Sequence, residues 1–141
     1  MTTNLLEAIN IERAVQAHTA LTLNAQLSLS AQRHAEDMIA RDYFAHENPE
    51  GLRVGDRVRA TGYGDLNAQK CRCSYRISIA ENLAKGQKFV NHVIQSWLDS
   101  PKHREALLAD VYDEVGIGIA GDVWVLNFGG IEINSGTSTQ Q

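Results

Sequence analysis

The chain has 141 residues, a length typical of one domain with a single hydrophobic core. Its formal net charge is −4 and it contains no long run of basic residues, which argues against nucleic acid or an anionic membrane as a partner. No apolar run approaches the ~20 residues of a membrane span. The N-terminus lacks the basic region of a secretory signal, so we expect either a cytosolic protein or a leader outside this chain.

A capping pair begins the first predicted helix. Asn4 and Glu7 have the spacing of such a pair and predict a helix over about residues 5–18. On this helix Asn10 and Arg13 lie beside an apolar stripe. These two polar side chains form either a buried hydrogen-bond network or the solvated edge of the stripe.

Two further helices are predicted before a long polar segment. The second covers about residues 28–42, and a short third covers about 53–61. The segment from 65 to 75 is polar and irregular and predicts a loop. Two cysteines in it, Cys71 and Cys73, are separated by a single residue, so a disulfide between them would be strained. Two thiols also supply only half of a typical four-ligand zinc site, and free thiols, a strained disulfide and an intermolecular bridge all stay open.

Four of the histidines can be judged from their local sequence. His46 lies in a loop just beyond a helix C-terminus, a position where function is common but a solvated side chain is more common. His18 and His34 have no suggestive neighbours and are assigned no role. His92 lies off the buried face of its predicted helix and is expected to be exposed.

A carboxylate interrupts the apolar face of the first long strand. Apolar residues alternate over 76–83, which is the period of a half-buried strand, and Glu81 shares one face with Ile77 and Ile79. Burying a carboxylate is costly unless it is paired or hydrogen-bonded. Glu81 is therefore a satisfied structural residue, or lies beyond the end of the strand, or belongs to a site in which His103 is the obvious candidate partner.

A helix corner supplies that second candidate. A helix over about 87–98 is followed by Ser100, at the N-cap position, and by Pro101, the first residue of another helix over about 101–109. His103 is then the third helical residue, where the helix macrodipole disfavours imidazolium. The effect is under about 1 kcal/mol at an exposed site, and it favours a neutral ring that can accept a proton or bind a metal.

Two closely spaced strands complete the predicted fold. Residues 115–120 and 123–128 are joined by a two-residue turn at Gly121-Asp122. Helices before and after a small antiparallel sheet predict an α+β protein, built as a three-layer α-β-α sandwich. We expect a single domain over 1–133 and a disordered polar tail over 134–141.

Four segments of the chain form a recognisable series. They are 43–46 (Tyr-Phe-Ala-His) with Gly51, 80–84 (Ala-Glu-Asn-Leu-Ala), 97–104 (Trp-Leu-Asp-Ser-Pro-Lys-His-Arg) and 114–118 (Glu-Val-Gly-Ile-Gly). In this order they resemble the CAP superfamily, which comprises cysteine-rich secretory proteins, antigen 5 and pathogenesis-related 1 and is also called the SCP domain. The similarity runs from about Leu5 to Gly129, and the order and spacing resemble the bacterial branch. The resemblance implies an α-β-α sandwich with a surface cleft formed by two histidines and two acidic residues.

Three of the four cleft residues are present by motif position, namely His46, Glu81 and His103. The family's second glutamate is replaced by Ser100, and Lys102 replaces the usual glycine. Both changes make the cleft less favourable to a divalent cation than in members that have all four residues. The resemblance also implies a secreted or cell-envelope protein, and a partner that is a small molecule, a lipid or another protein.

Three functions stay open for this cleft. The first, which we favour, is a binding module in which His46 and His103 hold a divalent metal such as zinc. Glu81 is then a further ligand or the acceptor that fixes one imidazole. The same three residues, together with Ser100, could instead bind a small or lipid-like ligand. The second is a hydrolase, with Ser100 as nucleophile and His103 as base, or with zinc-bound water and Glu81 as base. The third is a structural or partner-binding domain in which the cluster only stabilises the cleft.

Overall fold

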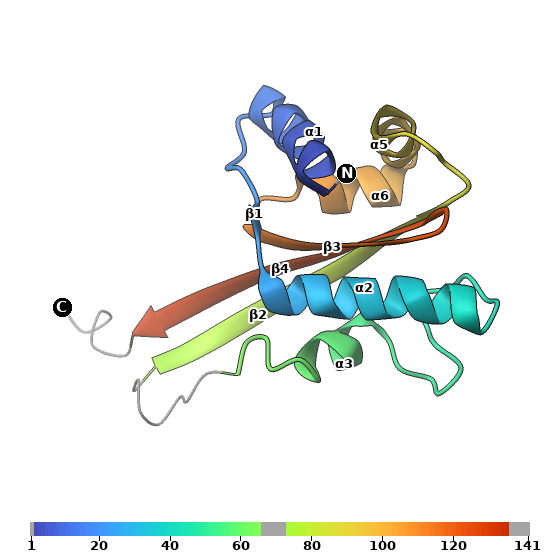
Figure 1. The fold of residues 1–141 in the computed structure, drawn as a ribbon. Coiled ribbons are helices and arrows are strands. Elements are labelled where there is room, and N and C mark those ends of the chain that lie inside the picture. The colour runs from blue at the N-terminus through green and yellow to red at the C-terminus, as the bar shows by residue number, and fades with distance from the viewer. Residues whose placement is uncertain (1, 66–72, 136–141) are drawn as a thin grey trace.

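A sheet between two helical layers forms the fold (Figure 1). The computed structural model describes residues 2–65 and 73–135. One face of the sheet is covered by α1 (Thr2–Val15), α5 (Val90–Leu98) and α6 (Pro101–Leu108), and the opposite face by α2 (Ala25–Ala40) and α3 (Val54–Arg59). The predicted α+β class and three-layer α-β-α sandwich are therefore confirmed.

The sheet is mixed, with four strands in the order β1-β3-β4-β2. The strands are β1 (Thr22–Leu23), β2 (Cys73–Lys85), β3 (Glu114–Ala120) and β4 (Val123–Ser135). Strands β2, β4 and β3 are antiparallel as predicted, whereas β1 pairs in parallel with β3. The small antiparallel sheet that was predicted is therefore extended by one short parallel strand, which was not predicted because a two-residue strand has no periodicity.

Strands β2 and β4 extend into segments that were predicted to be irregular. Their ladder continues to the pair formed by Cys73 and Ser135. The end of the expected 65–75 loop and the beginning of the expected tail are therefore strand, because each provides the other with a partner. Cys71 and residues 136–141 lie outside the described residues, as does the side chain of Cys73, so the state of the cysteines stays open.

Two polar residues of α1 form the buried hydrogen-bond network that was one of the two alternatives. The Asn10 side chain exchanges hydrogen bonds with the backbone of Leu21. The Arg13 guanidinium is fully buried and donates to four backbone carbonyls, those of Thr19, Leu107, Ala109 and Tyr112. Because these carbonyls include two at the end of α6, Arg13 holds in place the helix that carries His103.

The two faces of the sheet are covered by different kinds of side chain, and α2 approaches its face very closely. The α1-α5-α6 side contains large buried side chains, among them Trp97, Trp124 and Phe128. On the opposite side, α2 contributes the small residues Ala31 and Ala35, and a Cβ atom added at Gly116 or Gly118 of β3 would overlap the backbone of α2. Helix α2 therefore lies almost directly on the strand, with glycine as the residue that allows the approach.

Ser100 occupies the predicted N-cap position of α6, and Pro101 is the first helical residue as expected. The Ser100 side chain, however, makes no capping hydrogen bond. By contrast, the Asn24 side chain at the start of α2 accepts a bond from the Leu27 amide. A residue can thus satisfy the positional rule for a cap while its hydroxyl stays uncommitted.

This difference predicts unequal costs of removing the two side chains. Ser100→Ala is expected to change the free energy of unfolding by less than about 0.5 kcal/mol, whereas Asn24→Ala should lower it by about 1 kcal/mol. Urea denaturation of both variants measures the two values. A loss near 1 kcal/mol for Ser100→Ala would show that the hydroxyl does cap the helix in solution.

Candidate functional site

Glu81 lies within β2, and its side chain is only 1% exposed. The strand continues past it to Lys85, paired throughout with β4, so the alternative that the strand ends before residue 81 is wrong. Glu81 lies on the sheet face that is covered by α2 and α3, together with Ile77 and Ile79, which pack in the core cluster beneath α3. The predicted alternation is therefore confirmed.

Four hydrogen bonds satisfy the buried Glu81 carboxylate. Arg57 donates from Nη1 to Oε2 at 2.8 Å and from Nη2 to Oε1 at 3.0 Å, in a bidentate pair. Asn127 donates to Oε2 at 2.8 Å, and Nδ1 of His46 lies 3.0 Å from Oε1. Burial alone would raise the pKa of Glu81, but the bonds from His46 and Arg57 and the charge of Arg57 outweigh it, so the pKa lies below its usual value and the carboxylate is ionised.

Arg57 and Asn127 are the two partners of Glu81 that the sequence did not reveal, and Arg57 is the charged one. It lies on α3, and its side chain is 10% exposed, whereas Arg53 and Arg59 beside it in the chain are 66% and 70% exposed. Its guanidinium also donates to the backbone carbonyl of His46. The sequence did indicate that a buried Glu81 needs a cationic partner. It could not indicate which of the three closely spaced arginines is that partner, because tertiary packing decides which one reaches Glu81.

His46 lies at the open side of this cluster. Its side chain is 45% exposed, although Nδ1 faces the buried carboxylate. Because an ionised carboxylate only accepts hydrogen bonds, Nδ1 carries the proton. Whenever the ring is neutral, the lone pair therefore lies on Nε2, which can take a proton or a metal.

His103 is half-buried on α6, beside the edge strand β2. Its backbone carbonyl accepts a hydrogen bond of 3.0 Å from the Asn82 side chain, which ties the helix to the strand. Burial, and then the charge of His46, lower the pKa of His103. The predicted bias toward a neutral ring is confirmed in direction, but burial rather than the helix macrodipole is its main cause.

The predicted site residues do not complete a set of three metal ligands. Within residues 2–65 and 73–135, no three His, Cys, Asp or Glu side chains are grouped so that they could hold a metal ion. Among the described contacts, no hydrogen bond joins Ser100 to the ring of His103. The pair of His46 and His103 thus remains as two imidazoles, with Glu81 behind the first.

His34, to which no role was assigned, supports the loop that carries His46. It is 1% exposed, and its Nε2 lies 2.9 Å from the carbonyl of Ala45. Its Nδ1 lies 3.5 Å from the Tyr43 hydroxyl, which donates to Asp37. Burial lowers the pKa of His34, so the ring stays neutral and donates to Ala45. No sequence pattern marked His34, because its partners lie in an irregular loop. His92 is exposed as expected.

These shifts predict that acid destabilises the protein in two steps. The pKa values of His34 and His103 are lowered, so the unfolded chain takes up protons first as the pH falls below about 6.5, and the free energy of unfolding decreases. The lowered pKa of Glu81 adds a second loss as the pH falls below about 4.3. Urea unfolding at a series of pH values measures both steps. Constant stability between about pH 7 and pH 5.5 would contradict the first.

The comparisons with known sequences agree along most of the chain. Residues 6–128 match the family model described as CAP, the cysteine-rich secretory protein family. The protein YkwD of Bacillus subtilis (strain 168) is 30% identical over 126 residues, which cover 88% of this chain and 45% of YkwD. The membrane protein YlbC of the same organism is 26% identical over 124 residues, covering 88% of this chain and 33% of YlbC. The chain thus spans less than half the length of these relatives.

Two solved structures share the fold. An extracellular protein containing an SCP domain, from Bacillus anthracis str. Ames, superposes with a TM-score of 0.76 at 25% identity, covering 89% of this chain and 39% of that one. An outer surface protein from Borrelia burgdorferi superposes with a TM-score of 0.78 at 24% identity, covering 93% of this chain and 92% of that one. No helix in the part of our chain that the structure describes is both long and apolar enough to span a membrane.

Proposed function

The chain belongs to the cysteine-rich secretory protein (CAP) family, and from this premise we propose that it is a secreted or cell-envelope binding module whose cleft holds a divalent transition metal between His46 and His103. The observation that carries the proposal is the 3.0 Å contact between His46 Nδ1 and Glu81. This contact engages Nδ1, and so leaves Nε2 as the metal-binding atom of a side chain that is 45% exposed. A carboxylate behind a histidine is the arrangement that orients metal-binding imidazoles in proteins.

Glu81 supports the site in this proposal and is not itself a ligand. Both of its oxygens are occupied by the four hydrogen bonds described above, and a metal bond would require losing at least one of them inside the fold. The protein therefore supplies two imidazoles, which suit zinc better than calcium or magnesium. Affinity should be weaker than at a closed four-ligand site, since the remaining positions are left to water or to a small ligand with an oxygen or nitrogen donor.

The lowered pKa of His103 favours such binding at neutral pH. A metal competes with protons for imidazole, so each ring must be neutral. The lowered pKa of His103 helps to meet this condition. The positive charge of Arg57 acts against a cation, but the bidentate pair with Glu81 offsets it. A bound metal would supply Lewis acidity to whatever ligand fills the open positions.

Calorimetric titration of zinc into the metal-free protein at about pH 7.5 tests the proposal. We expect saturable binding that is lost in His46→Ala/His103→Ala. The matched control is His18→Ala/His92→Ala, which removes two histidines away from the cleft and should leave binding unchanged. Binding that survives in the cleft variant, or is absent from all three proteins, would contradict the proposal.

A purely structural role for the cluster is the second candidate. It is favoured by the saturation of the Glu81 carboxylate, which needs no ligand to complete its hydrogen bonds. Under this alternative, the unmodified protein binds no zinc and the two double variants behave alike. The hydrolase alternative stays a prediction, testable by turnover of ester and peptide substrates.

A further inference from the structure

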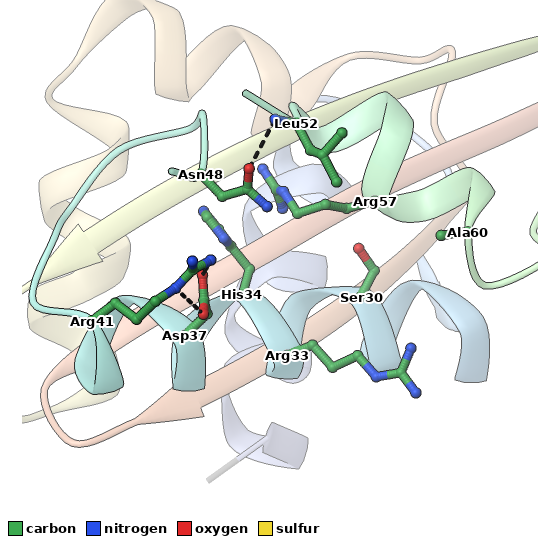
Figure 2. Close-up of a pocket in the computed structure, with 9 residues that line it drawn as sticks. All are labelled: Ser30, Arg33, His34, Asp37, Arg41, Asn48, Leu52, Arg57 and Ala60. Carbon is green, nitrogen blue, oxygen red and sulfur yellow. Dashed lines mark hydrogen bonds and ion pairs between the residues drawn. The ribbon is translucent and has the colours of Figure 1, made fainter. Parts of the chain in front are cut away.

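A pocket lies between α2 and α3 (Figure 2). Its volume is about 290 Å³, near the lower end of the range for small-molecule pockets. Arg57 contributes to its wall, while His46, Glu81 and His103 do not line it. The same guanidinium thus faces the cleft carboxylate with its two Nη atoms and lines this pocket as well.

Two buried polar groups of the wall have no hydrogen-bond partner among the described residues, namely Ser30 Oγ and Arg57 Nε. Ser30 is 2% exposed and comes from α2, and its hydroxyl points toward the Arg57 side chain on α3 (Figure 2). Both groups can donate a hydrogen bond. A buried donor that lacks an acceptor is costly, so each of these groups favours a ligand that brings an acceptor atom into the pocket.

The charges around the pocket are already paired. Asp37 accepts two bonds of 2.8 Å from Arg41, which also binds Glu50, and Arg57 is paired with Glu81. His34 is kept neutral by burial, and the guanidinium of Arg33 points away from the pocket (Figure 2). No unpaired charge among these described side chains therefore calls for an ionic ligand.

Apolar groups complete the lining. Leu52 comes from the loop before α3, and Ala60 comes from the end of α3. Leu52 is 43% exposed, so covering it would remove apolar surface from water. The wall thus combines two unpartnered donors with apolar surface.

We propose that the pocket between α2 and α3 is a binding site for a small uncharged ligand that has a carbonyl oxygen on an apolar body. The oxygen accepts from Ser30 Oγ and Arg57 Nε, and the apolar body covers Leu52 and Ala60. This site shares Arg57 with the cluster around Glu81, but it contains neither histidine of the proposed metal cleft and its ligand chemistry is different. It does not require a metal.

Two ligands of nearly the same shape test this proposal, acetophenone and ethylbenzene, of which only the first has the carbonyl oxygen. Each is titrated into metal-free, isotope-labelled protein, and the NMR signals of Arg57 Nε–H and of the backbone amides of Ser30 and Ala60 are followed. We expect saturable shifts of these signals with acetophenone. Ethylbenzene should bind about tenfold more weakly, the equivalent of roughly 1.4 kcal/mol.

Three variants make the test specific. Ser30→Ala should weaken acetophenone binding several-fold and leave ethylbenzene binding unchanged, whereas the matched control Ser28→Ala, on the same helix but outside the pocket, should alter neither. His46→Ala/His103→Ala should bind acetophenone like the unmodified protein, which separates this site from the cleft. Equal affinity for the two ligands would show an apolar cavity only. No saturable shift with either ligand would show that water alone satisfies the two donors. Either result would overturn the proposal.

Discussion

Glu81→Gln is expected to lower the free energy of unfolding by about 3–5 kcal/mol, although the two side chains have nearly the same shape. The change removes the negative charge that pairs with the Arg57 guanidinium, which is largely buried. It also turns one carboxylate oxygen into an NH₂ that faces two donors, either Arg57 and His46 at the Oε1 position or Arg57 and Asn127 at the Oε2 position. An unpaired buried cation and opposed donors are both far costlier than the loss of one ordinary hydrogen bond.

Urea denaturation measures this effect, and a double-mutant cycle assigns it to the pair. Arg57→Met should also be strongly destabilising, because it leaves a buried carboxylate without its cation. The double variant should lose clearly less than the sum of the two single losses, since neither charge is then left alone. Additive losses would indicate that the two residues contribute independently.

Glu50→Gln is the matched control for Glu81→Gln. Glu50 also pairs with an arginine, Arg41, through two hydrogen bonds, but this pair is exposed to solvent. Exposed ion pairs contribute little to stability, so a much smaller loss is expected than at Glu81. Comparable losses at the two positions would contradict the argument from burial.

The effect on the cleft should follow the effect on stability. Glu81 fixes the proton on His46 Nδ1, and Arg57 holds the backbone carbonyl of the same residue. A folded Glu81→Gln protein at low temperature should therefore bind zinc more weakly than the unmodified protein, under the proposed function. Loss of an oriented carboxylate behind a histidine ligand typically costs about 10–100-fold in metal affinity.

What the sequence predicted correctly at this site depends on strictly periodic patterns. The two-residue alternation of β2 placed Glu81 on a buried face, because a paired strand leaves no other orientation for its side chain. The corner before α6 was predictable for a similar reason, since proline tolerates few backbone positions in a helix. Local rules of this kind need no knowledge of the remaining chain.

What could not be predicted depends on how distant elements pack together. Arg57 is distinguished from Arg53 and Arg59 only by the way α3 crosses the sheet. His34 is buried because the loop after α2 folds back over it and presents the carbonyl of Ala45. Likewise, the Ser100 hydroxyl makes no capping hydrogen bond because of its side-chain geometry, which its N-cap position in the sequence does not reveal. A pattern shows where a residue lies on its own element, but not what a second element brings to it.

Gly116→Ala is expected to destabilise the protein by about 3 kcal/mol or more, although it adds only one methyl group. In β3, glycine alternates with larger apolar residues, so that Gly116 and Gly118 share the face beneath α2. A Cβ at Gly116 would overlap the backbone of Leu27 and Ser28, which cannot rotate away as a side chain can. The whole of α2 would have to move off the sheet and lose its contacts with Leu83 and Val125.

Gly55→Ala is the matched control for this prediction. Gly55 lies within α3, and the nearest atom to an added Cβ is the mobile guanidinium of Arg59 at 3.6 Å. Because alanine is the better helix former, stability should stay the same or rise by up to about 1 kcal/mol. Thermal and urea unfolding of both variants measure the contrast, and a Gly116→Ala protein as stable as Gly55→Ala would show that α2 does not pack directly on β3. Because α2 carries Ser30 and His34, the shift of α2 in Gly116→Ala should also weaken both proposed binding sites, although Gly116 belongs to neither site.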